Sequence, residues 1–134
     1  MSPVADCDKT IRQGRMAKAE EFADAARVVQ DLAEGPGDVA DAYVTLCVHA
    51  GIAASDVICC ARLGRYAQGN DHHEAVDLLK TAGPGFEQHL ATLLGLKTKS
   101  GYSHLPATAG EVKRAGRAVE ALLGEARRAH GTLA

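Results

Sequence analysis

Residues 39–63 read VADAYVTLCVHAGIAASDVICCARL, and this stretch decides the fold. If it forms a helix, apolar residues lie on nearly every side, so the helix must be contacted from several directions. Most of these residues are small, which lets neighbouring backbones approach closely. Asp38 is a suitable N-cap before the stretch, and Gly64 ends the periodic pattern after it. We therefore expect a central, buried helix over about 39–63.

Amphipathic patterns on both sides of this stretch predict the helices that surround it. Apolar residues recur at intervals of three and four, and clusters of Gly and Pro separate the periodic segments. Capping boxes predict two helix starts, at Asp71 with Glu74 and at Thr108 with Glu111. The expected helices cover about 9–33, 39–63, 71–82, 86–101 and 108–129. Because their linkers are short, the predicted fold class is all-α: an antiparallel bundle of four long helices and one short helix.

The length and composition favour a single helical domain. The chain has 134 residues, which fits one domain, expected over 9–134 after a flexible leader at 1–8. Its 25 alanines and only 4% aromatic residues favour packed helices over a β-sandwich. No apolar run reaches the roughly 18 residues of a membrane span, and the N-terminus lacks the apolar core of a signal peptide. We expect a cytoplasmic protein with no membrane contact.

The four cysteines suggest neither a disulfide framework nor a metal site. They have no regular spacing, and two are adjacent, so we expect reduced thiols. No C-x-x-C motif and no repeated Glu-x-x-His motif is present. His73 and Asp77 share a helix face without a third ligand nearby. We therefore expect no metal and no cofactor.

Two polar residues, His49 and Asp56, interrupt the apolar central helix. They are seven residues apart, which places them on one face but roughly 10 Å apart along the axis, so each needs its own partner. One interpretation is a core histidine and a buried carboxylate, each satisfied by hydrogen bonds. The other is that Asp56 orients a histidine or an arginine at a functional site, since an unpartnered buried carboxylate is costly.

The loop after the central helix is the densest polar stretch, and it contains Arg62, Arg65, His72 and His73. An arginine and a histidine in one pocket suit RNA cleavage without a metal. The imidazole moves a proton, and the guanidinium stabilises charge on the scissile phosphate. Arg65 and His72 are the candidate catalytic pair, with Asp56 as their orienting carboxylate. The alternative is that His72 only begins the third helix and that the spacing arose by chance.

The C-terminal third is basic. Residues 97–134 carry seven Lys or Arg against three Asp or Glu. Arg114 and Arg117 lie on one side of the last predicted helix, where they could contact phosphates. No aromatic residues are interleaved with them, so this surface is not a platform on which bases stack. The alternative is that these arginines only keep the surface soluble.

The central part of the chain resembles the HEPN domain, a family of helical nucleotide-binding proteins. The similarity covers roughly residues 15–128. It is carried by the alanine-rich helix from Ala42-Tyr43 to Val57-Ile58, by Gly69-Asn70-Asp71-His72 running into Ala75-Val76-Asp77-Leu78-Leu79, and by Leu90-x-x-Leu93-Leu94-x-x-Lys97 ending in Gly101-Tyr102-Ser103.

The resemblance implies a four- or five-helix bundle, frequent homodimerisation and a link to RNA or nucleotides. Many members are toxins or defence proteins that cut RNA without metal, using an arginine and a histidine at the spacing of Arg65 and His72. Those members usually carry the motif at a later helix, where this chain has Lys97 and His104. Two functions stay open: a non-catalytic dimer that binds RNA, a nucleotide or a nucleotidyltransferase partner, and a metal-independent endoribonuclease.

Two structural expectations complete this interpretation. Val28, Leu63 and Leu105 have no obvious apolar partner in a single bundle, which favours a homodimer. Asp56 and His72 are expected to lie in one polar cluster, with Arg65 or Tyr102 nearby. Arg62, His73, Tyr102, Arg114 and Arg117 are the candidate binding residues.

Overall fold

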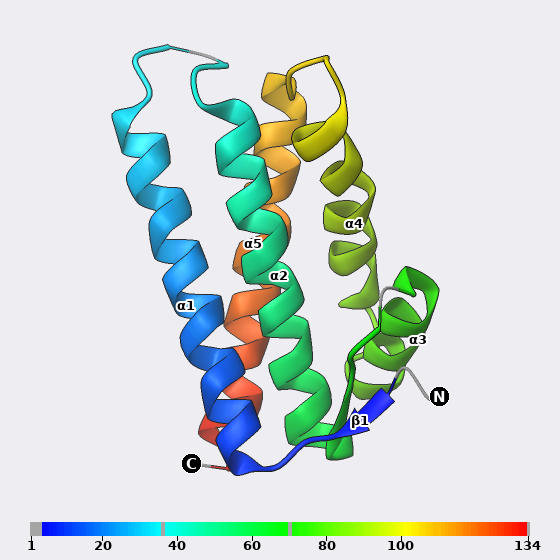
Figure 1. The fold of residues 1–134 in the computed structure, drawn as a ribbon. Helices are drawn as coiled ribbons and strands as arrows, with labels where there is room; N and C mark the ends of the chain where they lie inside the picture. Colours follow the sequence, from blue (N-terminus) through cyan, green and yellow to red (C-terminus); the bar gives the residue numbers. More distant parts are fainter. Residues whose placement is uncertain (1–3, 36, 70, 134) are drawn as a thin grey trace.

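The computed structural model describes residues 4–35, 37–69 and 71–133, and this part of the chain is mostly helical. The elements in chain order are β1 (Val4–Asp6), α1 (Lys9–Leu32), α2 (Ala40–Leu63), β2 (Arg65–Ala67), α3 (His72–Ala82), α4 (Glu87–Tyr102) and α5 (Ala109–Gly131). In Figure 1, α1, α2, α4 and α5 lie alongside one another, each running opposite to the one before it in this series. The short helix α3 lies beside the lower part of α4. The all-helical prediction is therefore confirmed in its main feature.

Helix α2 is the central element, as its composition predicts. Helices α1, α4 and α5 all contact it, and the residues from Ala53 to Cys60 are buried without interruption. Gly51 shows how close the packing is, because a Cβ atom there would lie 2.2 Å from Leu93 Cδ1 of α4. The small residues of α2 thus permit the approach of its neighbours.

The apolar character of α2 also satisfies the criteria for a membrane span. Its most apolar window has a mean hydropathy of 1.8, so the expectation that no run is long enough was wrong by this measure. However, 72% of that window is buried inside the protein. Packing within the domain therefore accounts for the hydropathy.

The helix starts follow the predicted capping residues with one exception. Asp71 accepts hydrogen bonds from the backbone N–H groups that begin α3, and Thr108 with Glu111 forms the predicted capping box of α5. Helix α2 differs, because Asp38 accepts from the Glu34 N–H at 3.1 Å instead of capping α2. Val39 takes the N-cap position in the left-handed region, with a φ of 53°, which is unusual for a β-branched residue.

The N-terminal segment is ordered where the sequence analysis expected a leader. Strand β1 pairs antiparallel with β2, and Val4 lies opposite Ala67. Asp8 then caps α1 by accepting a hydrogen bond from the Ile11 N–H at 2.8 Å. The described part of the expected leader at 1–8 is therefore structured, and residues 1–3 lie outside the described residues.

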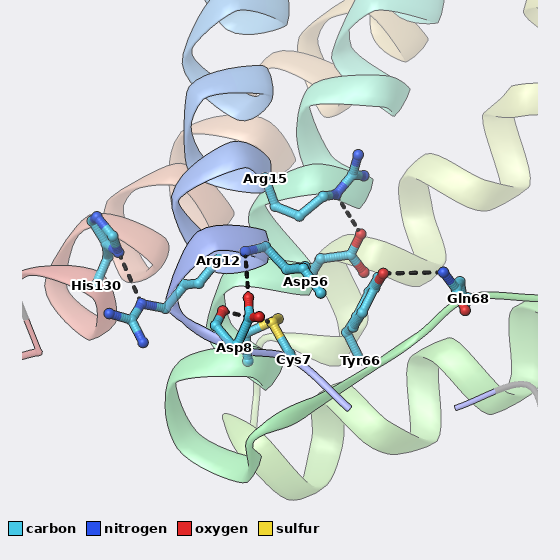
Figure 2. Close-up of a disulfide and its surroundings, with 10 residues drawn as sticks. Cys7, Asp8, Arg12, Arg15, Asp56, Tyr66, Gln68 and His130 are labelled. Carbon is cyan, nitrogen blue, oxygen red and sulfur yellow. Dashed lines mark hydrogen bonds and ion pairs between the residues drawn. A yellow bond between two sulfur atoms is a disulfide. The ribbon is translucent and has the colours of Figure 1, made fainter. Parts of the chain in front are cut away.

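A disulfide joins this N-terminal segment to the end of α2. Cys7 is bonded to Cys60, at a sequence separation of 53, so the expectation of four reduced thiols was wrong (Figure 2). The Cys7 N–H also donates to the Gly64 carbonyl at 2.9 Å. Irregular spacing could not reveal the pair, because the bond depends on the return of β1 to the C-terminal end of α2. Cys47 and Cys59 are free and buried.

Candidate functional site

A cavity of about 160 Å³ lies where α2, α3, α4 and the segment after β2 meet. Apolar side chains from α2, α3 and α4 form part of its wall, and the polar groups converge from different elements. Its lining residues are Ile52, Ser55, Asp56, Cys59, Ala67, Gly69, Asp71, His72, Ala75, Leu90, Leu94 and Lys97. A concave, partly apolar site with a few convergent polar groups is the usual form of a small-molecule site.

Asp56 is the buried acid of this cavity, and its partner is Arg15 of α1. The Arg15 Nε donates to Asp56 Oδ2 at 2.9 Å, and the Asp56 residue is 8% exposed (Figure 2). Burial raises the pKa of Asp56 to about 7, although the Arg15 guanidinium acts in the opposite direction. The carboxyl group can therefore gain or lose a proton near neutral pH. No hydrogen bond to Oδ1 forms within the described residues.

His72 and Lys97 supply the basic groups of the cavity. His72 begins α3, where the Asp71 carboxylate is occupied as the N-cap. The Lys97 side chain makes no hydrogen bond or ion pair within residues 4–35, 37–69 and 71–133. An ammonium without a partner among the described residues and an imidazole in the same cavity give it a place for an anionic group.

Ser55 and Cys59 add no nucleophile to this arrangement. The Ser55 hydroxyl donates to the Gly51 carbonyl at 2.8 Å within α2. Burial, together with the nearby Asp56 carboxylate, raises the pKa of the Cys59 thiol to about 12. A thiol that stays protonated is a poor nucleophile, so Cys59 contributes packing.

A second cavity of about 340 Å³ lies between α2 and α4, and Lys97 lines both cavities. Its other lining residues are Thr45, Val48, His49, Ser100, Gly101 and Tyr102. His49 is exposed and stacks on Phe22 with ring centroids 5.3 Å apart, so it is not a core histidine. Tyr102 is 82% exposed at the end of α4.

The predicted polar cluster is only partly present. Asp56 and His72, which were expected in one polar cluster, line the same cavity, and no hydrogen bond joins them within the described residues. The donor to Asp56 is an arginine, one of the two residue types expected, but it is Arg15 and not Arg65. Neither Arg65 nor Tyr102, one of which was expected nearby, lines this cavity. Arg65 is exposed in β2, where it lies opposite Asp6, and it does not line the cavity. The proposed catalytic pair is therefore not brought together in this cavity.

The remaining candidate binding residues occupy different places. The Arg62 guanidinium lies 3.2 Å from Glu125 Oε2 and 3.3 Å from the Ala82 carbonyl, so it links α2 with α5 and α3. His73 lines another hollow, between α3 and α4, together with Asp77.

No group of three His, Cys, Asp or Glu side chains suited to a metal occurs in the described part of the chain. Arg114 and Arg117 are exposed on α5, and neither lines the cavity that contains Asp56.

Arg15 and Arg12 are structural partners that the sequence pattern did not predict. Arg12 is 9% exposed, and its Nε donates to His130 Nδ1 at 3.2 Å, which joins the start of α1 to the end of α5 (Figure 2). A signal existed, because Arg12 continues the buried stripe of α1 one turn before Met16. Arg15 carried no comparable signal, since its partner lies 41 residues away.

Comparisons with protein-family models, with curated proteins and with solved structures found no match to this chain.

Proposed function

We propose that this chain is a HEPN-like helical bundle that binds a nucleotide, free or within RNA, without cleaving it. The observation that carries the proposal is the cavity where Lys97, His72 and the buried Asp56 converge. Lys97 offers an ammonium with no partner among the described residues, which suits a phosphate. The Asp56 carboxyl, with a pKa of about 7, offers a donor and an acceptor to the edge of a base.

The size of the cavity supports a base-sized ligand. A dry cavity of roughly 150 Å³ accepts a benzene ring, and this one measures about 160 Å³. Ile52, Leu90 and Leu94 provide apolar surface for the faces of a ring. Binding is favoured over cleavage because Arg65, the arginine of the expected catalytic pair, stands outside the cavity wall.

The binding proposal is tested by calorimetric titration with uridine and adenosine 5′-monophosphates. We expect Lys97→Ala and His72→Ala to weaken binding at least fivefold, roughly 1 kcal/mol, because they remove the groups that face the phosphate. Lys80→Ala and His104→Ala are the matched controls, since both residues are exposed and neither lines the cavity. Absence of binding at about 1 mM nucleotide would contradict the proposal.

A second candidate function is metal-independent RNA cleavage. One observation favours it: a carboxyl group with a pKa near 7, an imidazole and an ammonium face one cavity, as acid–base chemistry on a phosphodiester requires. Incubation of single-stranded RNA with the protein in EDTA separates the two functions. Cleavage that is lost in His72→Ala and kept in His104→Ala would replace the binding proposal with this one.

We further propose that the chain acts as a homodimer. Large apolar side chains stay exposed in the monomer, including Val28 at 59%, Leu32 at 71% and Leu105 at 54%. Leu63 does not contribute, because it packs against the core. Light scattering should report twice the chain mass of 14.0 kDa, and a monomer would contradict the proposal. A nucleotidyltransferase partner and a cytoplasmic location stay predictions.

A further inference from the structure

The two cavities share Lys97, and residues of α2 and α4 line both of them; we refer to the two cavities together as the α2–α4 groove. On α2, the lining residues of both cavities follow helical spacing: Thr45, Val48, His49, Ile52, Ser55, Asp56 and Cys59. On α4, the lining residues Leu90, Leu94, Lys97 and Gly101 do the same. Figure 1 shows these helices side by side and running in opposite directions, and each cavity is lined by residues from both of them. Lys97 stands at the junction of the two cavities.

We propose that this groove binds a dinucleotide unit of single-stranded RNA, with one base in each cavity and the linking phosphate on Lys97. The inference rests on the proposed function and extends it to the second cavity. Two cavities, of about 160 Å³ and 340 Å³, share Lys97, whose ammonium has no partner among the described residues. The first has the size of one ring, and the second has room for a base and a ribose. A nucleic-acid strand has the same order of groups: base, bridging phosphate, base.

The dimensions suit two bases that are splayed apart. Asp56 in the first cavity and His49 in the second are seven residues apart on α2, roughly 10 Å along the axis. Stacked neighbours in a strand are only about 3.4 Å apart. The groove therefore requires an unstacked strand, which is the form in which proteins usually read single-stranded RNA.

The second cavity has the side chains that a base and a ribose need. Tyr102, 82% exposed, presents a free aromatic face, and His49 is held in place by its stack on Phe22. The Thr45 and Ser100 hydroxyls lie 3.2 Å apart in the same cavity. Thr45 donates to Ser100, and Ser100 donates to the Lys97 carbonyl at 3.3 Å, so the two oxygens keep lone pairs that can accept a hydrogen bond. A ribose 2′-hydroxyl can donate to such an acceptor, and this group distinguishes RNA from DNA.

The test compares uridylyl-uridine with uridine 5′-monophosphate by calorimetric titration. We expect the dinucleotide to bind the wild type about tenfold more tightly, because it adds a second stacked base. Tyr102→Ala should abolish this gain and leave the affinity for the mononucleotide within roughly twofold, since Tyr102 lines only the second cavity. Lys97→Ala should weaken both ligands. His104→Ala, an exposed neighbour of Tyr102 that lines neither cavity, is the control.

The outcomes separate this inference from the proposed function. If the mononucleotide binds and the dinucleotide binds no more tightly, the groove inference is overturned and the proposed function stands. If neither ligand binds, both are overturned. Equal affinity for thymidylyl-thymidine overturns the assignment to RNA. A dinucleotide gain that survives in Tyr102→Ala overturns the role of the second cavity.

Discussion

The Arg15 Nε lies 2.9 Å from Asp56 Oδ2 and joins α1 to the wall of the α2–α3–α4 cavity. The Arg15 side chain is 26% exposed and that of Asp56 12%, so the pair is only partly solvated. Such a pair is costly to break from one side, because the remaining charge stays buried without a partner. The same contact therefore stabilises the fold and holds the Asp56 carboxyl group in the cavity.

Arg15→Ala should destabilise the protein by about 1–3 kcal/mol at pH 8, where Asp56 is ionised. Asp56→Ala should cost a similar amount, and the double variant should cost less than the sum, because each single change removes the same contact. Urea denaturation of the four proteins measures the coupling. Lys18→Ala, at an exposed position of α1, is the control and should change stability little. If the loss of stability in the double variant equals the sum of the two single losses, Arg15 and Asp56 are not coupled, and the prediction is contradicted.

Periodicity and capping predicted most of the helices, because those signals are local. Helix α2 is buried where its composition required, and Asp71 and Thr108 cap the helices they were expected to cap. Asp38 failed as a cap for α2 because its carboxylate accepts from Glu34 instead. Local patterns could not show this competition, since it depends on how the turn between α1 and α2 closes.

The features that the sequence did not predict depend on contacts between distant residues. The β1–β2 pairing and the Cys7–Cys60 bond both require the N-terminus to return to the end of α2. The sequence predicted no cavity, but it did place Asp56 and His72 in one polar cluster, and both residues line the cavity. The sequence identified Lys97 only as the residue that stands where HEPN ribonucleases usually carry the arginine of their motif. No spacing rule indicated that α4 would bring Lys97 to the cavity that contains Asp56.

Reduction of the Cys7–Cys60 bond should lower stability by up to about 4 kcal/mol, because the bond closes a loop with a sequence separation of 53 and so restricts the unfolded chain. Denaturation with and without a phosphine reductant measures the loss. The Cys7→Ser variant should show the lower stability in both conditions and no further response to the reductant. Equal stability of the oxidised and reduced wild type would contradict this prediction.

Gly51→Ala should destabilise the protein by about 1 kcal/mol or more, although alanine favours helices over glycine. The new methyl group would lie 2.2 Å from Leu93 Cδ1, and Leu93 is fully buried and has little room to move. Gly14→Ala on α1 is the matched control, because no atom lies within 4 Å of the place its methyl group would take. That variant should be stabilised by up to about 1 kcal/mol. Thermal denaturation measures the stability of both variants. Stabilisation of Gly51→Ala as well as Gly14→Ala would show that α2 and α4 are packed less closely than the Gly51–Leu93 contact requires.

The raised pKa of Asp56 predicts how stability depends on pH. Its pKa is about 7 in the folded protein, against an ordinary value of 3.8. Between these values the folded state binds more protons than the unfolded state, so raising the pH removes stability. The slope contributed by this one group is at most about 1.4 kcal/mol per pH unit, and it ends above pH 7.

Asp56→Asn provides the test, because an amide does not titrate. Glu111 does not interfere, because the Lys99 ammonium lowers its pKa to about 2, outside the window. We expect the stability of the wild type to fall relative to that of the variant as the pH rises from 5 to 7. Parallel curves from urea denaturation would show that Arg15 keeps Asp56 ionised throughout, and that burial does not control its pKa.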